Sequence, residues 1–368
     1  MSAAPRFLVS GYYGFGNTGD EAILGGLVEG FRELCPTAEL TVLSGNPADT
    51  IAEHRVIAVP RGLRSVRRQV KLCDVLISGG GGLLQDVTSW RSPLYYLAVM
   101  HLAQSARRPV ACIGQGIGPL RRGWMRALVR RQLSRAAIVA LRDELSQQSL
   151  IGLGLPTRAE VTADLAFLLP APTEADISAA REKAGLTGVS DPVAAISLRR
   201  TPGSADHEDV LRVAAIIAKS CDELGLRPLL VPMQPSQDVA LTAAVADVFP
   251  SRNALIASGL RAREILALLA SCRMVIAMRL HALIFAALSA VPPVAISYDP
   301  KVDSLMAQLC LPPPAHLRQP NGGRLAQAIR ETWNQRDTTS RALTDRLPHL
   351  RSLALRNVEL ALAVLPRQ

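Results

Sequence analysis

Arg279 and His281 are the residues of this chain whose types and placement best suit catalysis. They follow residues 273–278, an apolar run that predicts a buried strand, and they open an apolar stretch that predicts a helix. In α/β sheets, ligands bind beyond the carboxyl ends of strands, where helix N-termini attract anions. The alternative, a first helical turn that is polar by chance, is less favoured because a cation there opposes the helix dipole. A fixed cation beside a proton-transfer group therefore predicts chemistry on an anionic substrate.

A glycine-rich segment, residues 14–19, introduces a second group of polar residues. Its GxGxxG spacing between a predicted strand and a predicted helix is typical of dinucleotide-binding loops. Two features argue against a dinucleotide: Asp20 and Glu21 would occupy the place of the pyrophosphate, and no acidic residue ends the next strand to hold a ribose. We expect instead that Asn17, Thr18 and Asp20 contact a ligand that approaches the backbone closely. The alternative for Asp20 is a plain helix cap.

Two further glycine runs, residues 79–82 and 114–118, are expected to follow strands and to line one crevice with the first. Four consecutive glycines cost conformational entropy, so a ligand or another chain segment must approach the backbone there. We take Gly80 and Gly81 as substrate contacts. The phosphate-binding pattern GxxxxGK[ST] is absent, which disfavours ATPase chemistry, and no cofactor is expected.

The length and the order of apolar runs indicate a two-domain α/β protein. The 368 residues exceed the usual size of one domain. Short apolar runs alternate with helical stretches, which predicts doubly wound, mainly parallel sheets with helices on both faces. We expect an N-terminal domain over residues 1–170, a linker over 171–191 and a C-terminal domain over 192–320. Helices across 321–368 are expected to pack back over the domains.

Composition limits the location and the chemistry further. No run approaches the roughly 18 apolar residues of a membrane span. The apolar stretch before the first glycine segment is too short for a signal peptide, so we expect a cytoplasmic protein. The six cysteines form no CxxC pair, which predicts reduced core residues and no metal site.

The net charge of +10 is spread over both halves, with two local arginine-rich clusters. These clusters lie at residues 61–71 and 121–135. Such clusters attract anionic lipid head groups, or they are ordinary solvated helix faces. Nucleic acid is not expected as a partner, because aromatic residues do not alternate with the basic ones.

Six motifs in consistent order carry a resemblance to a known family. They are SGYYGFGNTGDEAIL, DVLISGGGGLLQD, IGQGIGPL, LRDELS, MRLHALIFA and ISYDPKV, and they span residues 10–302. In these motifs the chain resembles the polysaccharide pyruvyltransferase family, most closely its CsaB branch. The resemblance implies two domains in a GT-B-like arrangement with an interdomain cleft. It also implies transfer of the enolpyruvyl group of phosphoenolpyruvate to a sugar, with closure of a cyclic ketal.

The branch further implies an acceptor and a setting. It is implicated in pyruvylating N-acetylmannosamine of secondary cell-wall polymers, a modification that anchors surface-layer proteins. A lipid-linked saccharide would then be the acceptor, and phosphoenolpyruvate a co-substrate. Because such an acceptor lies at the inner face of the cytoplasmic membrane, peripheral contact with an anionic membrane is expected.

The resemblance also assigns roles to single residues. In the family pattern, the segment formed by Arg279, Leu280 and His281 supplies the donor site. Arg142, in LRDELS, and Lys301, in YDPKV, match two further basic positions that are tied to activity in the branch.

Four more expectations complete the predicted site. Arg199, at the end of a predicted strand, is a further cation for a substrate that carries both a carboxylate and a phosphate. His281 is expected to protonate the leaving phosphate or the methylene carbon. Asp20 is expected to take a proton from the sugar hydroxyl, from the opposite domain. The acceptor would bind the N-terminal glycine segments, with Asn17 and Thr18.

Two other functions remain open. A GT-B glycosyltransferase that uses a nucleotide sugar would share the architecture, although the motif set argues against it. A non-catalytic binding module would have no need of His281 together with several cations.

Overall fold

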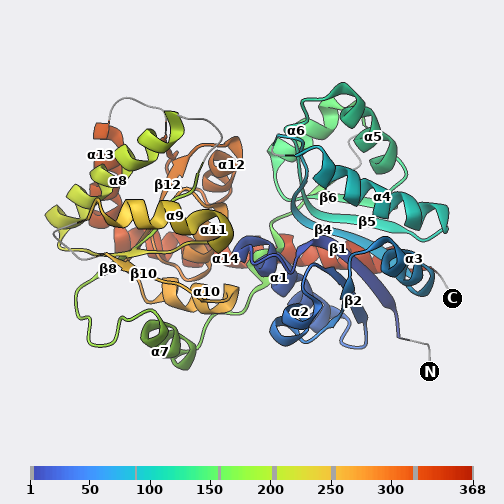
Figure 1. The fold of residues 1–368 in the computed structure, drawn as a ribbon, viewed down its shortest axis with the longest axis horizontal. Helices are drawn as coiled ribbons and strands as arrows, with labels where there is room; N and C mark the ends of the chain where they lie inside the picture. The colour runs from blue at the N-terminus through green and yellow to red at the C-terminus, as the bar shows by residue number, and fades with distance from the viewer. Residues whose placement is uncertain are drawn as a thin grey trace. The chain divides into compact units, whose positions relative to one another are not determined.

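The computed structural model describes residues 4–87, 89–155, 159–200, 205–249, 254–317 and 322–366. The chain forms two compact units (Figure 1). Unit 1 comprises Met1–Leu169 with His349–Gln368, and unit 2 comprises Pro170–Pro348. The chain therefore leaves unit 1 once and returns to it at its C-terminal end.

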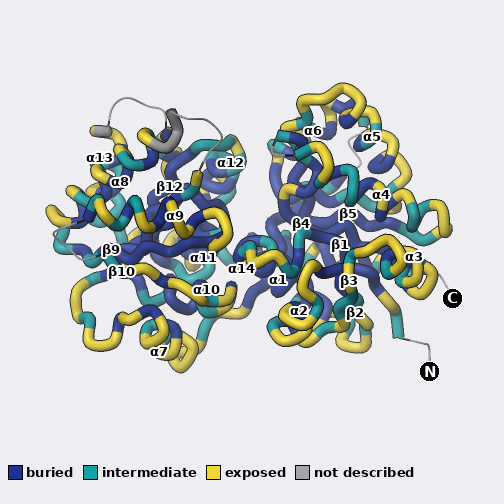
Figure 2. Tube along the Cα trace, in the orientation of Figure 1, coloured by how far each residue is buried: buried dark blue, intermediate teal, exposed yellow. Residues whose placement is uncertain are grey.

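Unit 1 is built on a parallel sheet with the strand order β3-β2-β1-β4-β5-β6-β7. The strands are β1 (Arg6–Tyr13), β2 (Glu39–Ser44), β3 (Ile57–Pro60), β4 (Val75–Leu84), β5 (Val110–Ile117), β6 (Ile138–Leu141) and β7 (Glu160–Val161). The central strands are apolar along their length and buried, as Figure 2 shows. Such continuous apolar strands require helices on both faces of the sheet.

The helices of unit 1 supply those two layers. They are α1 (Thr18–Leu34), α2 (Pro47–His54), α3 (Leu63–Leu72), α4 (Arg91–Ser105), α5 (Gly123–Leu133), α6 (Glu144–Gly152) and the short η1 (Leu165–Leu168). Side chains of α3, α4, α5 and α6 share one hydrophobic core with strand residues such as Leu76 and Cys112. Helix α1 packs closely on η1, since a Cβ atom on Gly26 would lie 1.9 Å from the carbonyl oxygen of Leu165.

Residues 79–82 lie inside β4 and residues 114–117 lie inside β5, so the prediction that these two glycine runs follow strands is wrong. Gly79 pairs with Ile113 and Gly81 pairs with Gln115, and the register shifts beyond them. Gly80 and Gly81 have positive φ values of 55° and 75°, which glycine adopts without strain. A Cβ atom on Gly80 would lie 2.2 Å from the Ile23 side chain of α1. A segment of the chain itself therefore approaches the backbone of this run.

Unit 2 holds a second parallel sheet with the strand order β10-β9-β8-β11-β12-β13. The strands are β8 (Val193–Ser197), β9 (Arg227–Leu230), β10 (Leu255–Ile256), β11 (Met274–Ala277), β12 (Pro293–Ser297) and β13 (Ala315–His316). The helices are α7 (Glu174–Lys183), α8 (Ala205–Leu224), α9 (Pro235–Ala246), α10 (Ala262–Ala270), α11 (Leu280–Leu288), α12 (Pro300–Gln308) and α13 (Gly322–Asn334). Side chains of α8, α9 and α13 share one hydrophobic core with the strands. The expectation of two doubly wound units is thus confirmed.

The segment predicted as a linker, residues 171–191, contains helix α7 and belongs to unit 2. Thr173 and Asp176 form a capping box that starts this helix. Lys183, near its end, donates two hydrogen bonds of 3.0 Å to Glu264 of α10. The segment is therefore a packed part of the fold, which corrects the prediction.

Helix α14 (Arg336–Ala363) belongs to both units, because the division falls after Pro348. The start predicted for the C-terminal helices, residue 321, lies outside the described residues. Within the described ranges, no helix is both long and apolar enough to cross a membrane.

Asn357 attaches the last part of α14 to unit 1. It is fully buried, and its side-chain oxygen accepts hydrogen bonds from Gly114 N–H (2.7 Å) and from the Thr162 hydroxyl (2.9 Å). Its amide nitrogen donates to the carbonyl oxygens of Ala163 and Ala354, both at 3.1 Å. One buried amide thus satisfies backbone groups of the sheet, of the segment before η1 and of α14.

We predict that Asn357→Ala lowers the free energy of unfolding of unit 1 by about 3 kcal/mol, because it leaves buried donors and acceptors unsatisfied. Denaturant titration in a Trp333→Phe background isolates unit 1, since Trp90 and Trp124 then supply the fluorescence. Asn334→Ala, at an exposed position of α13, is the control. In a protein that retains Trp333, this substitution should leave the unfolding midpoint at the wild-type value. An unchanged midpoint for Asn357→Ala would refute this role.

Candidate functional site

The strand order of unit 2 reverses between β8 and β11. These strands are neighbours, but the chain continues from β8 outward to β9 and β10, and from β11 outward to β12 and β13. Ser197, at the end of β8, pairs with Ala277, at the end of β11. The connections that follow both strands therefore start side by side, at the position where doubly wound sheets bind ligands.

Arg279 follows β11 and is held by a buried carboxylate. Its side chain is 11% exposed and forms an ion pair with Asp238, which is fully buried in the first turn of α9. The other oxygen of Asp238 accepts a hydrogen bond of 2.9 Å from Gln234 N–H. Burial and the nearby charge of Arg199 lower the pKa of Arg279, whereas Asp238 opposes this effect. The guanidinium group stays charged, because arginine pKa values lie far above neutrality.

Arg199, which follows β8, and Lys301, in the first turn of α12, both contact Tyr298. Arg199 donates a hydrogen bond of 2.7 Å to the Tyr298 hydroxyl, and its guanidinium carbon lies 4.7 Å from the centre of the ring. Lys301 Nζ lies 5.4 Å from the same ring centre and 3.3 Å from Asp299 Oδ2. Burial would raise the pKa of Tyr298, but Lys301 and Arg199 together lower it. Three of the predicted cations thus gather at one edge of the sheet.

His281 is the second residue of α11 and is half-buried. Arg279 is the N-cap residue of this helix, and Leu280 is its first residue. Leu280 is 8% exposed, so its side chain belongs to the packing of the helix. Helices α9, α11 and α12 all begin just beyond this edge of the sheet, and the positive ends of their dipoles add to the cationic side chains. The arrangement suits an anion with a proton-transfer group beside it.

In unit 1, the strand order reverses between β1 and β4, and Asp20 lies at that position. Asn17 is the N-cap of α1, because its side-chain oxygen accepts a hydrogen bond of 3.0 Å from Gly19 N–H. The alternative of Asp20 as the cap is therefore wrong. Thr18 is 5% exposed. Asp20 is half-buried, and a Cβ atom on Gly81 would lie 3.1 Å from its Oδ1.

The loop before α1 is fixed by a buried acid. Glu21 Oε1 accepts a hydrogen bond of 2.8 Å from Gly14 N–H, and Glu21 Oε2 lies 3.3 Å from His54 Nε2. Glu53 joins this group, so that three ligand-type atoms lie within 4.8 Å of one another. Both oxygens of Glu21 already serve the loop and the histidine. The cluster is therefore explained by support of the loop, and we assign no ion to it.

Aromatic rings and the guanidinium group of Arg61 stack beside this loop, an arrangement that the sequence did not predict. Tyr12 stacks on Phe15 with 4.4 Å between the ring centres. The Arg61 guanidinium carbon lies 5.0 Å from the Phe15 ring centre and 3.9 Å from that of Tyr95. Burial and the nearby charge of Asp20 raise the pKa of Tyr12, so this stack lies within electrostatic reach of Asp20.

Arg142 lies in unit 1, whereas the other predicted cations lie in unit 2. It is 8% exposed, its Nε donates a hydrogen bond of 3.1 Å to Asp143, and its Nη1 lies 3.6 Å from Asp164 Oδ2. A Cβ atom on Gly116 would lie 2.9 Å from its guanidinium group, which accounts for that glycine. Two buried carboxylates thus already balance this charge.

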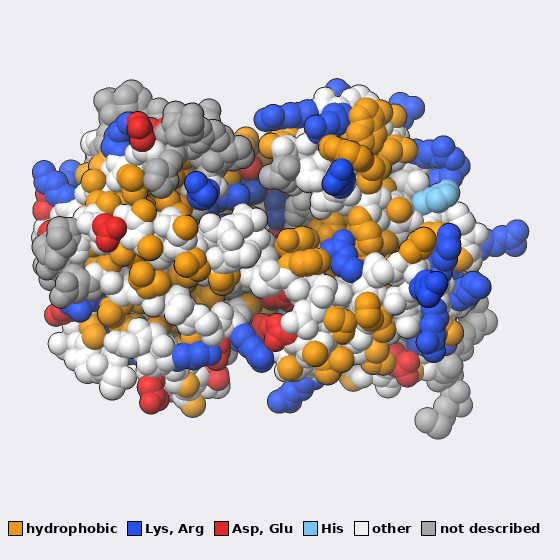
Figure 3. Space-filling view, viewed as in Figure 1, with side chains coloured by type: hydrophobic (Ala, Val, Ile, Leu, Met, Phe, Trp, Pro, Cys, Tyr) orange, Lys and Arg blue, Asp and Glu red, His pale blue; other side chains and the backbone are white. Residues whose placement is uncertain are grey.

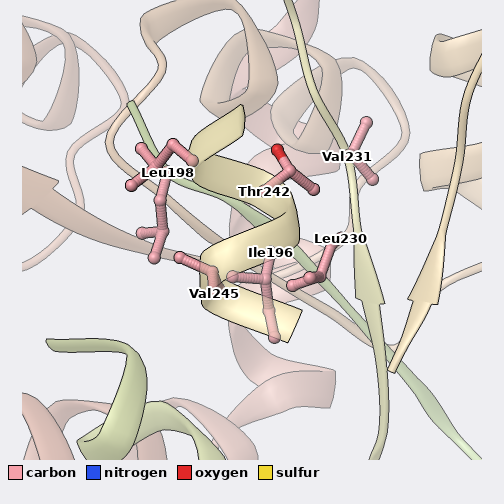
Figure 4. A pocket seen from close by; sticks show the side chains of 7 residues that line it. Ile196, Leu198, Leu230, Val231, Thr242 and Val245 are labelled. Atoms are coloured by element: carbon pink, nitrogen blue, oxygen red, sulfur yellow. The ribbon is translucent and has the colours of Figure 1, made fainter. Parts of the chain in front are cut away.

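A small pocket in unit 2 contains none of these charged groups (Figure 4). Its lining consists of Ile196, Leu198, Leu230, Val231, Leu241, Thr242 and Val245. Thr242 contributes a hydroxyl, which donates to the carbonyl oxygen of Asp238 at 2.8 Å. Because the rest of the lining is apolar and mostly belongs to the hydrophobic core, the pocket is a gap in packing beneath α9. It does not suit an anion.

Asp238 and Tyr298 are the residues of the cationic site that the sequence did not reveal. Asp238 lies 41 positions before its partner Arg279, in a different strand–helix unit. The run QPSQD offered a helix-start signal, with proline at the first helical position and an acid in the first turn. Tyr298 stands inside the motif ISYDPKV, but nothing local marks its contact with Arg199.

The lowered pKa of Tyr298 gives a spectroscopic test of this cluster. Burial raises the pKa of each of the other four tyrosines, Tyr12, Tyr13, Tyr95 and Tyr96. We predict that one tyrosinate absorbance step occurs below the ordinary value, that Lys301→Met shifts it to higher pH and that Tyr298→Phe removes it. Lys219→Met, an exposed lysine on α8, should leave it in place. A low step that survives in Tyr298→Phe would contradict the assignment.

Comparison with solved structures supports the fold. A glycosyltransferase from Rickettsia africae covers 100% of both chains with a TM-score of 0.65 at 12% identity. The UDP-GlcNAc 2-epimerase of Neisseria meningitidis covers 97% of this chain and 100% of its own, with a TM-score of 0.57 at 11% identity. The ADP-heptose lipopolysaccharide heptosyltransferase II of Escherichia coli gives 0.52 at 14% identity, over 90% and 99%. At these identities the likeness is one of fold, the GT-B-like pair of α/β units.

Sequence comparison identifies the family of the chain. The chain is 25% identical over 271 residues to the amylovoran biosynthesis protein AmsJ of Erwinia amylovora. The match covers 70% of this chain and 64% of AmsJ, less than two thirds of that protein's length. Residues 17–300, which include Asp20, Arg199 and Arg279, match the polysaccharide pyruvyl transferase family. The chain therefore belongs to the polysaccharide pyruvyl transferase family.

Proposed function

We propose that this protein transfers the pyruvyl group of phosphoenolpyruvate to two hydroxyls of a sugar and closes a cyclic ketal. The observation that carries the proposal is the gathering of Arg279, Arg199 and Lys301 at the strand reversal of unit 2, with His281 beside them. Phosphoenolpyruvate carries a carboxylate and a phosphate, and a site of several cations and helix N-termini matches both.

The three cations differ in what they offer to an anionic ligand. Arg279 presents a planar fork, held in place by Asp238, which suits bidentate binding of a carboxylate or a phosphate. Lys301 supplies a compact charge beside the N-terminus of α12. Tyr298 keeps Arg199 in place through the hydrogen bond to its hydroxyl. The bound anion would relieve the mutual repulsion of these cations, which favours binding.

Ketal formation requires two proton movements, and we assign His281 to one of them. The first sugar hydroxyl adds to the central carbon of phosphoenolpyruvate while the methylene carbon gains a proton and becomes a methyl group. The second hydroxyl replaces the phosphate and closes the ring. The two hydroxyl protons thus end on the methyl group and on the released phosphate. His281 would deliver one of them, a role that suits an imidazole near neutral pH.

Asp20 is the proposed base that takes the proton from the sugar hydroxyl. It is half-buried beside Gly81 and lies at the strand reversal of unit 1. This assignment requires that unit 1 bind the acceptor and unit 2 the donor. Asn17 and Thr18 would act mainly by shaping the loop, since the first caps α1 and the second is buried.

The acceptor proposed for this reaction is N-acetylmannosamine of a lipid-linked cell-wall polymer precursor, as in the CsaB branch, and the modification would anchor surface-layer proteins. Phosphoenolpyruvate is the only co-substrate in the scheme. A nucleotide-sugar glycosyltransferase is the competing function, because the solved structures of similar fold include a glycosyltransferase and a heptosyltransferase. The two functions differ in the mass that they add to the acceptor.

We predict that the protein releases phosphate from phosphoenolpyruvate only when a suitable sugar acceptor is present. Mass spectrometry of the acceptor should show the gain of one pyruvyl group with the loss of two hydroxyl protons. Incubation of the same acceptor with nucleotide sugars is the control. Addition of a hexose instead of pyruvate would refute the proposal in favour of a glycosyltransferase.

We predict that His281→Ala folds normally, since it lies at a helix N-terminus, and lowers turnover by roughly 100-fold or more, as expected on loss of a positioned proton-transfer group. His101→Ala, an exposed histidine on α4, is the matched control and should retain activity. Turnover is measured as acceptor-dependent phosphate release. Near-normal turnover of a folded His281→Ala protein would remove this residue from the mechanism.

A further inference from the structure

Two of the three tryptophans of the chain lie exposed and in contact with each other on unit 1. Trp90, just before α4, is 41% exposed, and Trp124, in the first turn of α5, is 45% exposed. Their ring centres lie 6.1 Å apart in an edge-to-face arrangement. The Arg91 guanidinium carbon lies 5.5 Å from the Trp90 ring centre. Exposed tryptophan pairs are unusual on a protein surface that faces only water.

The same region carries a continuous excess of positive charge. Residues 87–142 contain ten arginines and no acidic residue, while the rest of the chain contains 31 basic and 31 acidic residues. The whole formal charge of +10 thus resides in this stretch. Both halves of the sequence have a positive net charge, so a comparison of the halves does not reveal this local concentration of arginines. The stretch covers α4, β5, α5 and β6, and one of its arginines, Arg142, is buried beside Asp143 and does not belong to this surface.

Helix α5 directs its basic residues outward. Met125 and Val129 are buried, whereas Arg126 and Arg130 are exposed on the other side of the helix. In Figure 3, hydrophobic side chains gather over the part of unit 1 that carries α5, with Lys and Arg side chains around them. The surface therefore combines aromatic side chains with a rim of fixed positive charge.

The segment that leads into α5 is rigidly held. Asp86 accepts hydrogen bonds from the backbone N–H groups of Arg121 (2.7 Å) and Arg122 (2.9 Å), and Arg122 Nη1 donates to its carbonyl oxygen (2.8 Å). Asp86 Oδ2 also lies 3.4 Å from Arg122 Nη1, so this carboxylate offsets the charge of Arg122 and leaves the charges of Arg126 and Arg130 in place. Trp124 therefore keeps a fixed position beside Trp90.

We infer that the tryptophan–arginine surface, formed by Trp90, Trp124, Arg126 and Arg130, docks on an anionic lipid bilayer. Tryptophan favours the interface between lipid and water because its ring is apolar and its N–H is polar. Arginines near an anionic surface add on the order of 1 kcal/mol each, and salt screens this term. Trp90 follows β4 along the chain and Trp124 follows β5, so the surface lies at the carboxyl edge of the sheet of unit 1. Asp20, which follows β1, lies at that same edge.

The inference does not rest on pyruvyl transfer, because it concerns binding alone. The probe is a set of vesicles made of phosphatidylcholine alone, or of phosphatidylcholine with phosphatidylglycerol. We expect cosedimentation with the anionic vesicles at low salt, a loss of binding as salt rises, and quenching of tryptophan fluorescence by brominated lipid. Quenching is measured in the Trp333→Phe background, so that it reports only Trp90 and Trp124.

Two pairs of substitutions separate the contributions. Trp90→Ala with Trp124→Ala should lower the partition coefficient on the order of tenfold at every salt concentration, because it removes apolar contact area. Arg126→Gln with Arg130→Gln should lower it by roughly tenfold or more at low salt and reduce its salt dependence. Arg324→Gln with Arg341→Gln removes the same charge from exposed positions of unit 2 and should change little.

The outcomes that overturn the inference are distinct. Wild-type protein that ignores anionic vesicles at low salt would do so, as would tryptophan or arginine pairs that behave like the unit 2 control. A dimer that dissociates in the tryptophan variant would assign the surface to a second copy of the chain instead. Pyruvyl transfer to a water-soluble acceptor should persist in all these variants, so failure of the docking surface and failure of the proposed function are distinguishable.

Discussion

The candidate site depends on the pairing of Arg279 with the buried carboxylate of Asp238. Burial lowers the pKa of Arg279, and repulsion by the nearby charge of Arg199 lowers it further. Asp238 offsets this repulsion within the protein and fixes the guanidinium group, while Tyr298 fixes Arg199. Among the residues that the structure describes, the carboxylates paired with these cations are those of Asp238 and Asp299. Such a site gains most from a ligand that carries two anionic groups.

Unit 1 obtains its polar edge in a different way, through the close approach of α1 to the glycine run of β4. Gly80 accommodates Ile23, and Gly81 leaves room for Asp20. Glu21 then ties the preceding loop to Gly14 and His54. The glycines therefore act through the position of α1, and the carboxylate of Asp20 is placed by packing as much as by its own contacts.

The sequence predicted the features that depend on local pattern. The strand–helix junction at Arg279, the alternation of elements and the two doubly wound sheets all follow from apolar runs and their flanks. It missed what depends on distant partners, above all the pairing of Asp238 with Arg279. Glycines inside a strand that lies beneath a helix have the same sequence pattern as glycines that follow a strand. Helix α7 was predictable from the capping pair of Thr173 and Asp176.

The central claim is that the cationic edge of unit 2 binds phosphoenolpyruvate, and calorimetric titration of this ligand tests it most directly. Loss of a charge-assisted contact should weaken binding roughly tenfold or more in Arg279→Gln and in Lys301→Met. Lys219→Met, which removes an exposed lysine of the same unit, should bind as the wild type does, and so should Asp20→Asn in unit 1. Unchanged affinity in both Arg279→Gln and Lys301→Met, or loss of affinity only in Asp20→Asn, would contradict the account.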